Sequence, residues 1–385
     1  MRFVEKKFVN IKPSSTLSIN ELSKKIQTQG KKVFKFGLGQ SPFPVPSILV
    51  KELQKNAHSK DYLDVSGLYE LRDSIAKYHT SKNKFGYNAD DVLVGPGSKE
   101  LLFQCQMVFD GITLLPAPSW VSYAPQANFL GKKILWIQTT AKENWHITAN
   151  LLEDICKKDK ENKLLILNSP NNPSGWTMSN QEQKTILEFA RKKGLWIVSD
   201  EVYARISFKN NHAPSFCEVM EKDDRVIIVN SFSKSWAMTG WRLGWITAPA
   251  KLGVQFEKLN EYNVAGPPPF IQQAGIAALK EGEAFIHESN NRYLHALSYF
   301  TEWAKAQKRI EFDPPTAAFY AFFKIRDAND SLEMAKDLLK KGVGLAPGRA
   351  FGPQFDSYLR LCFASSIPKL EKGLNRLEDW LTDFV

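Results

Sequence analysis

The sequence contains few cysteines and no long hydrophobic run. Its 385 residues include only four cysteines, which are widely spaced and form no CxxC pair: Cys105, Cys156, Cys217 and Cys362. This spacing indicates neither a disulfide framework nor a metal site. No apolar segment approaches the ~20 residues that a membrane-spanning helix needs, and the opening MRFVEKKFVN is too polar for a signal peptide. We therefore expect a cytoplasmic protein that makes no membrane contact and holds no metal.

Charge of one sign is not concentrated in any segment either. Lysine and arginine number 51 against 41 aspartates and glutamates, which gives a net charge of +10. The excess is spread over short doublets such as Lys24-Lys25 and Lys340-Lys341, whereas a nucleic-acid-binding tail gathers its charge in one block. The composition therefore predicts no nucleic-acid partner and only a mild preference for anionic ligands.

What the sequence does contain is an alternation of short apolar runs and helical patterns. Three runs, KLLILN (163–168), LWIVS (195–199) and RVIIVN (225–230), are apolar on both faces, which is typical of parallel strands buried under helices. Helical spacing marks GLYELRDSIAKYHT (67–80) and the capped segment 179–194. We therefore predict an α/β fold in which helices sandwich a mostly parallel sheet.

The C-terminal part has a different pattern, in which helices flank only a few strands. In order we expect a long helix, a strand, a capped helix, a second strand and a final helix, over residues 284–307, 319–325, 330–342, 357–364 and from 368 onward. This order indicates a separate, smaller α+β domain. We place the large domain at residues 46–275 and assign residues 1–45 and 276–385 to the small domain with its N-terminal arm.

Polar residues follow each of the three buried strands. Asn172 follows the first strand, Asp200 and Tyr203 follow the second, and Lys234 follows the third. In open α/β sheets, ligands bind beyond the carboxyl ends of the strands. We therefore expect these four side chains to face one crevice.

Groups that bind anions lie near the same strand ends. Two hydroxyls and a guanidinium suited to a phosphate dianion follow the third strand: Ser231, Ser233 and Arg242. A further anion site is predicted where the turn 95–97 leads into a helix that begins at Ser98 and Lys99, because the N-terminus of a helix favours phosphate.

The lysine among these anion-binding groups needs an explanation. A free lysine has a pKa of ~10.4, so Lys234 becomes useful as a nucleophile only if its pKa falls or if it forms an imine. One cofactor uses an imine-forming lysine, a phosphate clamp, an acid beside a pyridinium nitrogen and donors to a phenolate oxygen, and it is pyridoxal 5′-phosphate. The residues at the strand ends therefore predict a pyridoxal-phosphate site.

Four segments of the chain resemble the fold-type I, class I and II aminotransferases, the family of the aspartate aminotransferases. They are SPNNPSG, SDEVY, SFSKSWAMTGWRLGW and LRLCFASS, in this order. The resemblance extends from KPSSTLSI at Lys12 to the final helix. It implies the fold of that family, a homodimer with shared active sites, and ping-pong transfer of an amino group between an amino acid and a 2-oxoacid.

By this resemblance, Lys234 would anchor the cofactor covalently and then act as the base and acid of the proton shift. Asp200 would pair with the pyridinium nitrogen, and Tyr203 and Asn172 would bond the oxygen on the ring. The phosphate would be surrounded by Ser98, Lys99, Ser231, Ser233 and Arg242. Tyr62, in YLDVSGLYELR, would reach the phosphate of the neighbouring subunit.

The resemblance also assigns residues to the substrate. Arg360, in YLRLCF, would bind the α-carboxylate as a bidentate pair, and Gly39, in GLGQSPFP, would bring the backbone close to that carboxylate. Trp120, in PAPSWVSY, would stack on the cofactor ring and, together with Asn172, would border the substrate.

The substrate side chain stays open between two classes. Lys99, Ser14 and Ser15 match positions that contact a distal carboxylate in one branch of the family, which favours aspartate or glutamate with 2-oxoglutarate. An aromatic content of 12% and the bulky Trp176, expected at the mouth of the site, favour aromatic or large apolar amino acids. A carbon–sulfur lyase on the same fold would use the same Lys234 and is a further alternative.

Two other protein classes fit the sequence less well. A dinucleotide-binding enzyme needs GxGxxG, but the run GPGSKE places Glu100 where the third glycine belongs. An effector-sensing module of a DNA-binding regulator needs a helix-turn-helix region, which we do not expect because the sequence opens at the N-terminal arm of the family.

Overall fold

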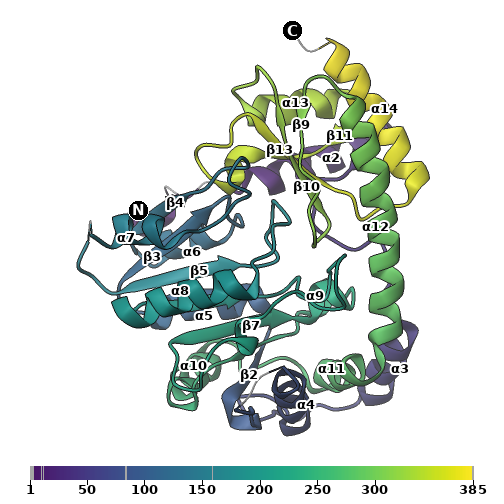
Figure 1. The fold of residues 1–385 in the computed structure, drawn as a ribbon. Coiled ribbons are helices and arrows are strands. Elements are labelled where there is room, and N and C mark those ends of the chain that lie inside the picture. The colour runs from purple at the N-terminus through teal and green to yellow at the C-terminus, as the bar shows by residue number, and fades with distance from the viewer. Residues whose placement is uncertain (1–3, 10, 12, 83–84, 158, 384–385) are drawn as a thin grey trace.

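A seven-stranded sheet crosses the larger part of the molecule (Figure 1). The computed structural model describes residues 4–383 apart from residues 10, 12, 83–84 and 158, so Lys12 lies outside the described residues. The strands follow the order β2 (Val92–Gly95), β8 (Gly244–Thr247), β7 (Val226–Ser231), β6 (Trp196–Asp200), β5 (Lys163–Asn168), β3 (Ile112–Ala117) and β4 (Ile134–Gln138). Neighbouring strands are parallel except that β8 runs antiparallel to β2 and β7. The mostly parallel sheet predicted from the sequence is confirmed.

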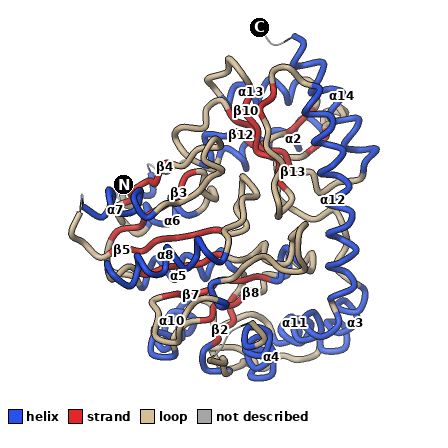
Figure 2. The backbone as a smooth tube through the Cα atoms, in the orientation of Figure 1, coloured by secondary structure: helices blue, strands red, loops and turns tan. Residues whose placement is uncertain are grey.

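Helices cover both faces of this sheet (Figures 1 and 2). The helices of this part are α3 (Ser47–Asn56), α4 (Tyr69–Thr80), α5 (Ser98–Val108), α6 (Tyr123–Phe129), α7 (Ala149–Lys157), α8 (Asn180–Lys193), α9 (Phe232–Ser235), α10 (Ala250–Asn263) and α11 (Pro269–Glu281), with the 3-10 turns η1 (Ala89–Asp91), η2 (Phe216–Glu218) and η3 (Thr239–Trp241). In β5, Leu165 and Leu167 pack with α7 and α8, whereas Leu164 and Ile166 pack with α5 and α10. Because successive side chains of a strand point to opposite faces, this apolar strand fills both layers.

A second, antiparallel sheet lies above the first in Figure 1. Its strands are β12 (Ala346–Pro347), β13 (Tyr358–Cys362), β10 (Tyr320–Ile325) and β9 (Ile310–Glu311), and a separate parallel pair joins β1 (Phe34–Lys35) to β11 (Val343–Gly344). The remaining helices are α1 (Lys6–Val9), α2 (Ser15–Thr28), α12 (Glu283–Ala306), α13 (Ser331–Lys340) and α14 (Ile367–Asp383), with the 3-10 turn η4 (Gly348–Phe351). Helix α12 runs the height of the molecule, from α11 at one end to α14 at the other.

None of the described helices is long and apolar enough to cross a membrane.

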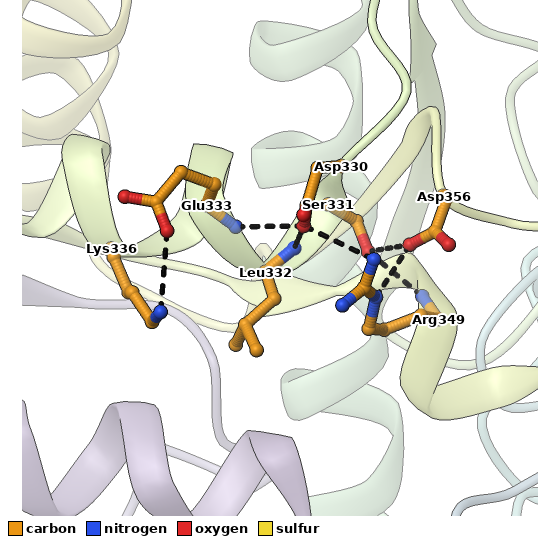
Figure 3. A network of polar contacts seen from close by, with 7 residues as sticks. All are labelled: Asp330, Ser331, Leu332, Glu333, Lys336, Arg349 and Asp356. Carbon is orange, nitrogen blue, oxygen red and sulfur yellow. Dashed lines mark hydrogen bonds and ion pairs between the residues drawn. The ribbon is translucent and has the colours of Figure 1, made fainter.

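An ion-pair network holds η4 against the start of α13 (Figure 3). Arg349 donates from Nε to Oδ1 of Asp356 at 2.6 Å, and its Nη2 lies 3.2 Å from Oδ1 of Asp330, the residue that caps α13. The hydroxyl of Ser331 donates to Asp356 and accepts the backbone N–H of Arg349, both at 3.0 Å. This network fixes η4, which ends at Phe351, and the ring of Phe351 lies 4.9 Å from the guanidinium carbon of Arg360.

Candidate active site

The carboxyl ends of β5, β6 and β7 meet at a cavity of about 200 Å³. The predicted site residues that line it are Gly39, Ser98, Lys99, Trp120, Asn172, Asp200, Tyr203, Lys234 and Arg360. Loops, drawn in tan in Figure 2, lie between this edge of the large sheet and the second sheet. Four predicted residues are not part of the lining: Ser231, Ser233, Arg242 and Tyr62.

Lys234 enters the cavity from the short helix α9, directly after β7. Its Nζ donates to the backbone oxygen of Gly39 at 2.6 Å and lies 5.8 Å from the centre of the Tyr203 ring. Burial lowers the pKa of Lys234 to about 8, and the positive charges of Arg360 and Arg242 act in the same direction. The neutral, nucleophilic fraction of this amine near neutral pH is therefore far larger than that of an ordinary lysine.

Asp200 is the last residue of β6, and its carboxylate is buried. Its Oδ2 accepts the hydroxyl of Tyr123, and its Oδ1 accepts the backbone N–H of Val202 at 3.2 Å. Burial raises the pKa of Asp200 to about 6, against the lowering effect of these two bonds and of Lys234. No ion pair between described residues includes Asp200, so this carboxylate is suited to a cationic ligand atom.

Arg360 is a buried arginine, only 4% exposed, at the centre of β13. Its Nη1 donates to Oδ1 of Asn172 at 2.8 Å and its Nη2 donates to the backbone oxygen of Gly37 at 2.5 Å. Its Nε is buried and finds no hydrogen-bond partner among the described residues. The guanidinium lies over the rings of Tyr320 and Phe351, 4.4 and 4.9 Å from their centres. A buried guanidinium with a free donor, and with no carboxylate partner among the residues described, fits an incoming carboxylate.

Two contacts of Tyr320 restrict which residues fit in the cavity wall that contains Tyr203 and Gly39. The hydroxyl of Tyr203 lies 2.7 Å from the hydroxyl of Tyr320. A Cβ atom at Gly39 would lie 1.8 Å from the Tyr320 hydroxyl, so only glycine fits there. The backbone oxygen that accepts the bond from Lys234 therefore belongs to a position where a side chain would collide with Tyr320.

Positive groups gather at the N-terminus of α5. The N-cap of α5 is Gly97, with φ of 89°, and the guanidinium of Arg242 lies so close that a Cβ atom at Gly97 would be 2.5 Å from its Nη2. Arg242 is itself held by the backbone oxygens of Thr239 at 2.9 Å and Pro96 at 3.4 Å. Burial lowers the pKa of Lys99, and Arg242 lowers it further. Two cations beside the first backbone N–H groups of a helix are suited to a phosphate.

The hydroxyl of Ser231 caps the short helix α9, which contains Ser233. The hydroxyl of Ser231 accepts the backbone N–H of Ser233 at 3.1 Å and donates to the backbone oxygen of Leu243 at 3.2 Å. Both serines are buried beside the cavity without lining it. The structure therefore gives Ser231 a capping role that the sequence reading did not include.

Three aromatic residues of the sequence reading lie in different surroundings. Trp120 lines the cavity, and the Nζ of Lys99 is 5.3 Å from its ring centre. Trp176 does not stand at the mouth of the site: it packs beside His146 and lines a separate small cavity. That expectation was wrong, because the turn that follows Asn172 directs this side chain into the core beside α7 and α8. Tyr62 is 92% exposed in the single chain.

Sequence reasoning missed Tyr123 and Tyr320. Tyr123 lies three residues beyond Trp120 at the start of α6, and Tyr320 begins β10. Each makes its important contact through space, with Asp200 and with Tyr203 respectively. Tyr123 ends the segment PAPSWVSY, in which only Trp120 was given a role. Nothing in the local sequence of either tyrosine indicates which distant residue it contacts.

The chain is similar to known aminotransferases over nearly its full length. Residues 31–377 match the family model described as aminotransferase class I and II. The chain is 30% identical to the aspartate aminotransferase of Thermotoga maritima, over 98% of this chain and 99% of that protein. It is 29% identical to aromatic-amino-acid aminotransferase 2 of Thermococcus litoralis, over 97% of each chain.

The fold is shared with solved structures as well. The aspartate aminotransferase of Thermus thermophilus, solved with maleate, superposes with a TM-score of 0.92 at 25% sequence identity, over 98% of this chain and 100% of that one. The expected α/β architecture with its second, smaller sheet is therefore confirmed. The chain belongs to the class I and II aminotransferase family and is an enzyme of the transferase class.

Proposed function

We propose that this enzyme is a pyridoxal-phosphate-dependent aminotransferase that takes aspartate or glutamate as amino donor and a 2-oxoacid such as 2-oxoglutarate as acceptor. The observation that carries the proposal is the combination of three buried groups on one cavity. They are an amine whose pKa is lowered, a carboxylate without an ion-pair partner among the described residues, and a guanidinium with an unused donor: Lys234, Asp200 and Arg360.

The residues of the cavity fit pyridoxal 5′-phosphate. Lys234 would anchor it, Asp200 would hold the proton on its ring nitrogen, and Tyr203 and Asn172 would face its ring oxygen. The phosphate would lie among the groups at the N-terminus of α5 and the start of α9: Ser98, Lys99, Ser231, Ser233 and Arg242. When bound, the cofactor supplies the aldehyde that exchanges the amino group and an electron-withdrawing ring.

The protein's own groups would orient the substrate and move its proton. Arg360 would bind the α-carboxylate through its free Nε and one Nη, because these donors form a planar fork. The Nζ of Lys234 would take the proton from the α-carbon of the substrate and would deliver it to the cofactor carbon that had carried the aldehyde. Asn172 already accepts a bond from Arg360 and would keep that guanidinium in the plane that the carboxylate needs.

Lys99 supports a substrate with a second carboxylate. Its side chain lines the cavity, together with Ser14. No ion pair joins it to a carboxylate within the part of the chain that the structure describes. The Thermus thermophilus relative was solved with maleate, a dicarboxylate. A distal carboxylate would therefore meet a positive charge at this wall.

A larger chamber beside the cavity favours a second substrate class. The chamber measures about 910 Å³ and shares Lys99, Trp120 and Val121 with the cavity. Its other walls are mainly apolar and include Phe103, Phe129, Trp136, Ala350 and Pro353. An aromatic or long apolar side chain could extend past Lys99 into this space, so aromatic amino acids are the second candidate donors.

Two variants separate the roles of the cationic side chains. We expect Arg360→Ala to lower kcat/KM for every amino acid by about 10²–10³-fold, because each donor carries the same α-carboxylate. Lys99→Met should lower kcat/KM for aspartate and glutamate by about 10–100-fold more than for phenylalanine, because any loss at the cofactor phosphate is common to all donors. The measurement is the spectral conversion of the cofactor-loaded enzyme by each amino acid at saturating cofactor.

The outcomes of this comparison decide the substrate class. If Lys99→Met slows phenylalanine as much as aspartate, Lys99 serves only the cofactor and the dicarboxylate assignment is wrong. If wild-type enzyme converts phenylalanine faster than either acidic donor, the apolar chamber sets the substrate. If pyruvate and ammonia form without a 2-oxoacid, the enzyme is a lyase instead.

The uptake of pyridoxal phosphate by cofactor-free protein should follow the pKa of Lys234. Only the neutral amine attacks an aldehyde, and the pKa of this lysine is lowered to about 8. We therefore expect the rate at which the visible absorbance band appears to rise with pH and to level off above about pH 8. A rate that continues to rise up to the pKa of an ordinary lysine would contradict the lowered value.

We also propose that the working unit is a homodimer. Tyr62 is 92% exposed and Tyr262 is 85% exposed, and large exposed aromatic side chains favour an interface. In the dimer, Tyr62 of the partner subunit would complete the phosphate site, since Tyr62 does not line the cavity of its own chain. Sedimentation of the purified protein checks the dimer.

We also propose two domains and a cytoplasmic location. The division into residues 46–275 and residues 1–45 with 276–385 is supported by the two sheets, whose strands fall at 92–247 and 310–362. A cytoplasmic location is supported by the four cysteines, all of which are free thiols, as is usual in a reducing compartment.

A further inference from the structure

Tyr320 joins two parts of the site that the proposed function treats separately. Its ring is fully buried on β10, opposite Cys362 of β13. The guanidinium carbon of Arg360 lies 4.4 Å from the ring centre, and the Tyr320 hydroxyl lies 2.7 Å from the hydroxyl of Tyr203. One side chain therefore contacts both the proposed carboxylate-binding group and the proposed donor to the cofactor ring.

The number of protons fixes the direction of the bond between the two tyrosines. Each phenol has one proton to donate. Burial raises the pKa of Tyr203 and of Tyr320 far above the usual range, so both groups keep their protons across the working pH range. If the proton of Tyr203 points to a cofactor oxygen in the cavity, the bond between the hydroxyls must be donated by Tyr320. That donation makes Tyr203 a stronger donor in turn, because linked hydrogen bonds polarise one another.

The position of the Tyr320 hydroxyl is closely restricted. Gly39 stands against it, since a Cβ atom there would lie 1.8 Å from the oxygen. On the other side, the guanidinium carbon of Arg360 lies 4.4 Å from the ring centre and fixes the plane of the ring. The surroundings therefore hold the hydroxyl within reach of Tyr203.

We propose that Tyr320 is a positioning residue with two separable parts. Its hydroxyl directs the proton of Tyr203 toward the cofactor's ring oxygen, and its ring supports the Arg360 guanidinium that receives the substrate's α-carboxylate. The inference rests on the proposed function, because it needs a pyridoxal-phosphate ring in the cavity.

The two parts predict different effects for two substitutions. Tyr320→Phe removes only the hydroxyl, which leaves Tyr203 a weaker donor. Negative charge on the cofactor's ring oxygen is then less stabilised. The Lys234 nitrogen that is linked to the cofactor therefore holds its proton more strongly. We expect the pH midpoint of the bound cofactor's visible absorbance to rise by about 0.5–1 pH unit, while KM for amino acids changes by less than about threefold. Tyr320→Leu also removes the ring, so KM should rise by about tenfold for every amino acid.

The matched control is Tyr87→Phe, in which a tyrosine loses a hydroxyl that donates to the Sδ of Met220 at 3.5 Å and that lines no part of the cavity. This variant should keep the wild-type midpoint and the wild-type KM. Thermal unfolding of all three variants, with and without cofactor, checks that each is folded. If Tyr320→Leu does not fold, Tyr320→Phe alone provides the test, because it keeps the ring.

The outcomes separate this inference from the proposed function. If wild-type protein takes up no cofactor and has no visible band, the proposed function fails. If the wild-type band titrates and Tyr320→Phe titrates at the same pH as Tyr87→Phe, only the role of Tyr320 is overturned. A Tyr320→Phe enzyme whose KM rises tenfold with an unchanged midpoint would also overturn it, because the hydroxyl would then serve Arg360 and not Tyr203.

Discussion

Replacing Lys234 with alanine is expected to lower the rate of amino-group exchange by about 10⁴-fold. Two losses add together, since the variant has neither the amine that anchors the cofactor nor the base that takes the α-proton. Among the described residues that line the cavity, the other lysine is Lys99, which lies beside Trp120 at the N-terminus of α5 and so does not replace Lys234. The measurement is the exchange rate between an amino acid and a 2-oxoacid, with the visible spectrum of the same sample.

Lys251→Ala is the control for this variant. Lys251 is exposed at the start of α10 and lines no part of the cavity, so its removal should leave the rate within about twofold. A Lys234→Ala enzyme that is folded and exchanges amino groups at a rate close to that of Lys251→Ala would refute the role given to Lys234.

Asp200→Asn is expected to lower kcat by about 10²–10⁴-fold with the fold intact. The amide has almost the shape of the carboxylate, but it carries no charge to keep a proton on the ring nitrogen, so the ring withdraws electrons less strongly. The buried environment makes the lost charge matter more, because few water molecules reach the group. The stopped-flow rate of the first half-reaction measures this loss directly.

Glu201→Gln provides a matched comparison, because Glu201 is the neighbouring buried carboxylate. It accepts bonds from the hydroxyls of Ser199 at 3.0 Å and Ser215 at 2.7 Å and from the backbone N–H of Phe216 at 3.1 Å, and it does not line the cavity. This variant should lose some stability and keep kcat within about threefold. If the two variants lose kcat equally, the rate depends on buried charge in this region. It would then not depend on pairing between Asp200 and a ring nitrogen.

The parts of the fold that could be predicted are those with a local physical cause. The run KLLILN became β5 over residues 163–168, because an apolar strand fills both layers of a covered sheet. The predicted caps of α8 are present: Ser179 accepts the backbone N–H of Glu182, and Gly194 ends the helix with φ of 71°. Strand β6 extends one residue beyond its apolar run, to Asp200, so that the carboxylate stands at the strand end.

The site could be predicted only where residues follow strand ends or match a motif. Asn172, Asp200, Tyr203 and Lys234 meet on one cavity because parallel strands end at the same edge of a sheet. The hydroxyl pair of Tyr203 with Tyr320 joins the loop after β6 to β10, and neither segment contains a signal for this contact.

The expectation for Trp176 failed for a related reason. Bulk alone does not say which way a side chain points, and the turn directs this ring toward His146. The choice between acidic and aromatic donors also depends on space that the sequence does not describe, since the chamber beside Lys99 is formed by residues from distant segments.

The most direct test of the central claim is to locate the covalent bond between protein and cofactor. Cofactor-loaded enzyme is treated with borohydride, which makes the bond permanent, and is then digested and examined by mass spectrometry. The pyridoxyl-phosphate group should be found on Lys234, in the peptide that follows β7. Finding that group on another lysine, or recovering the cofactor entirely free from a sample that was yellow before reduction, would contradict the account.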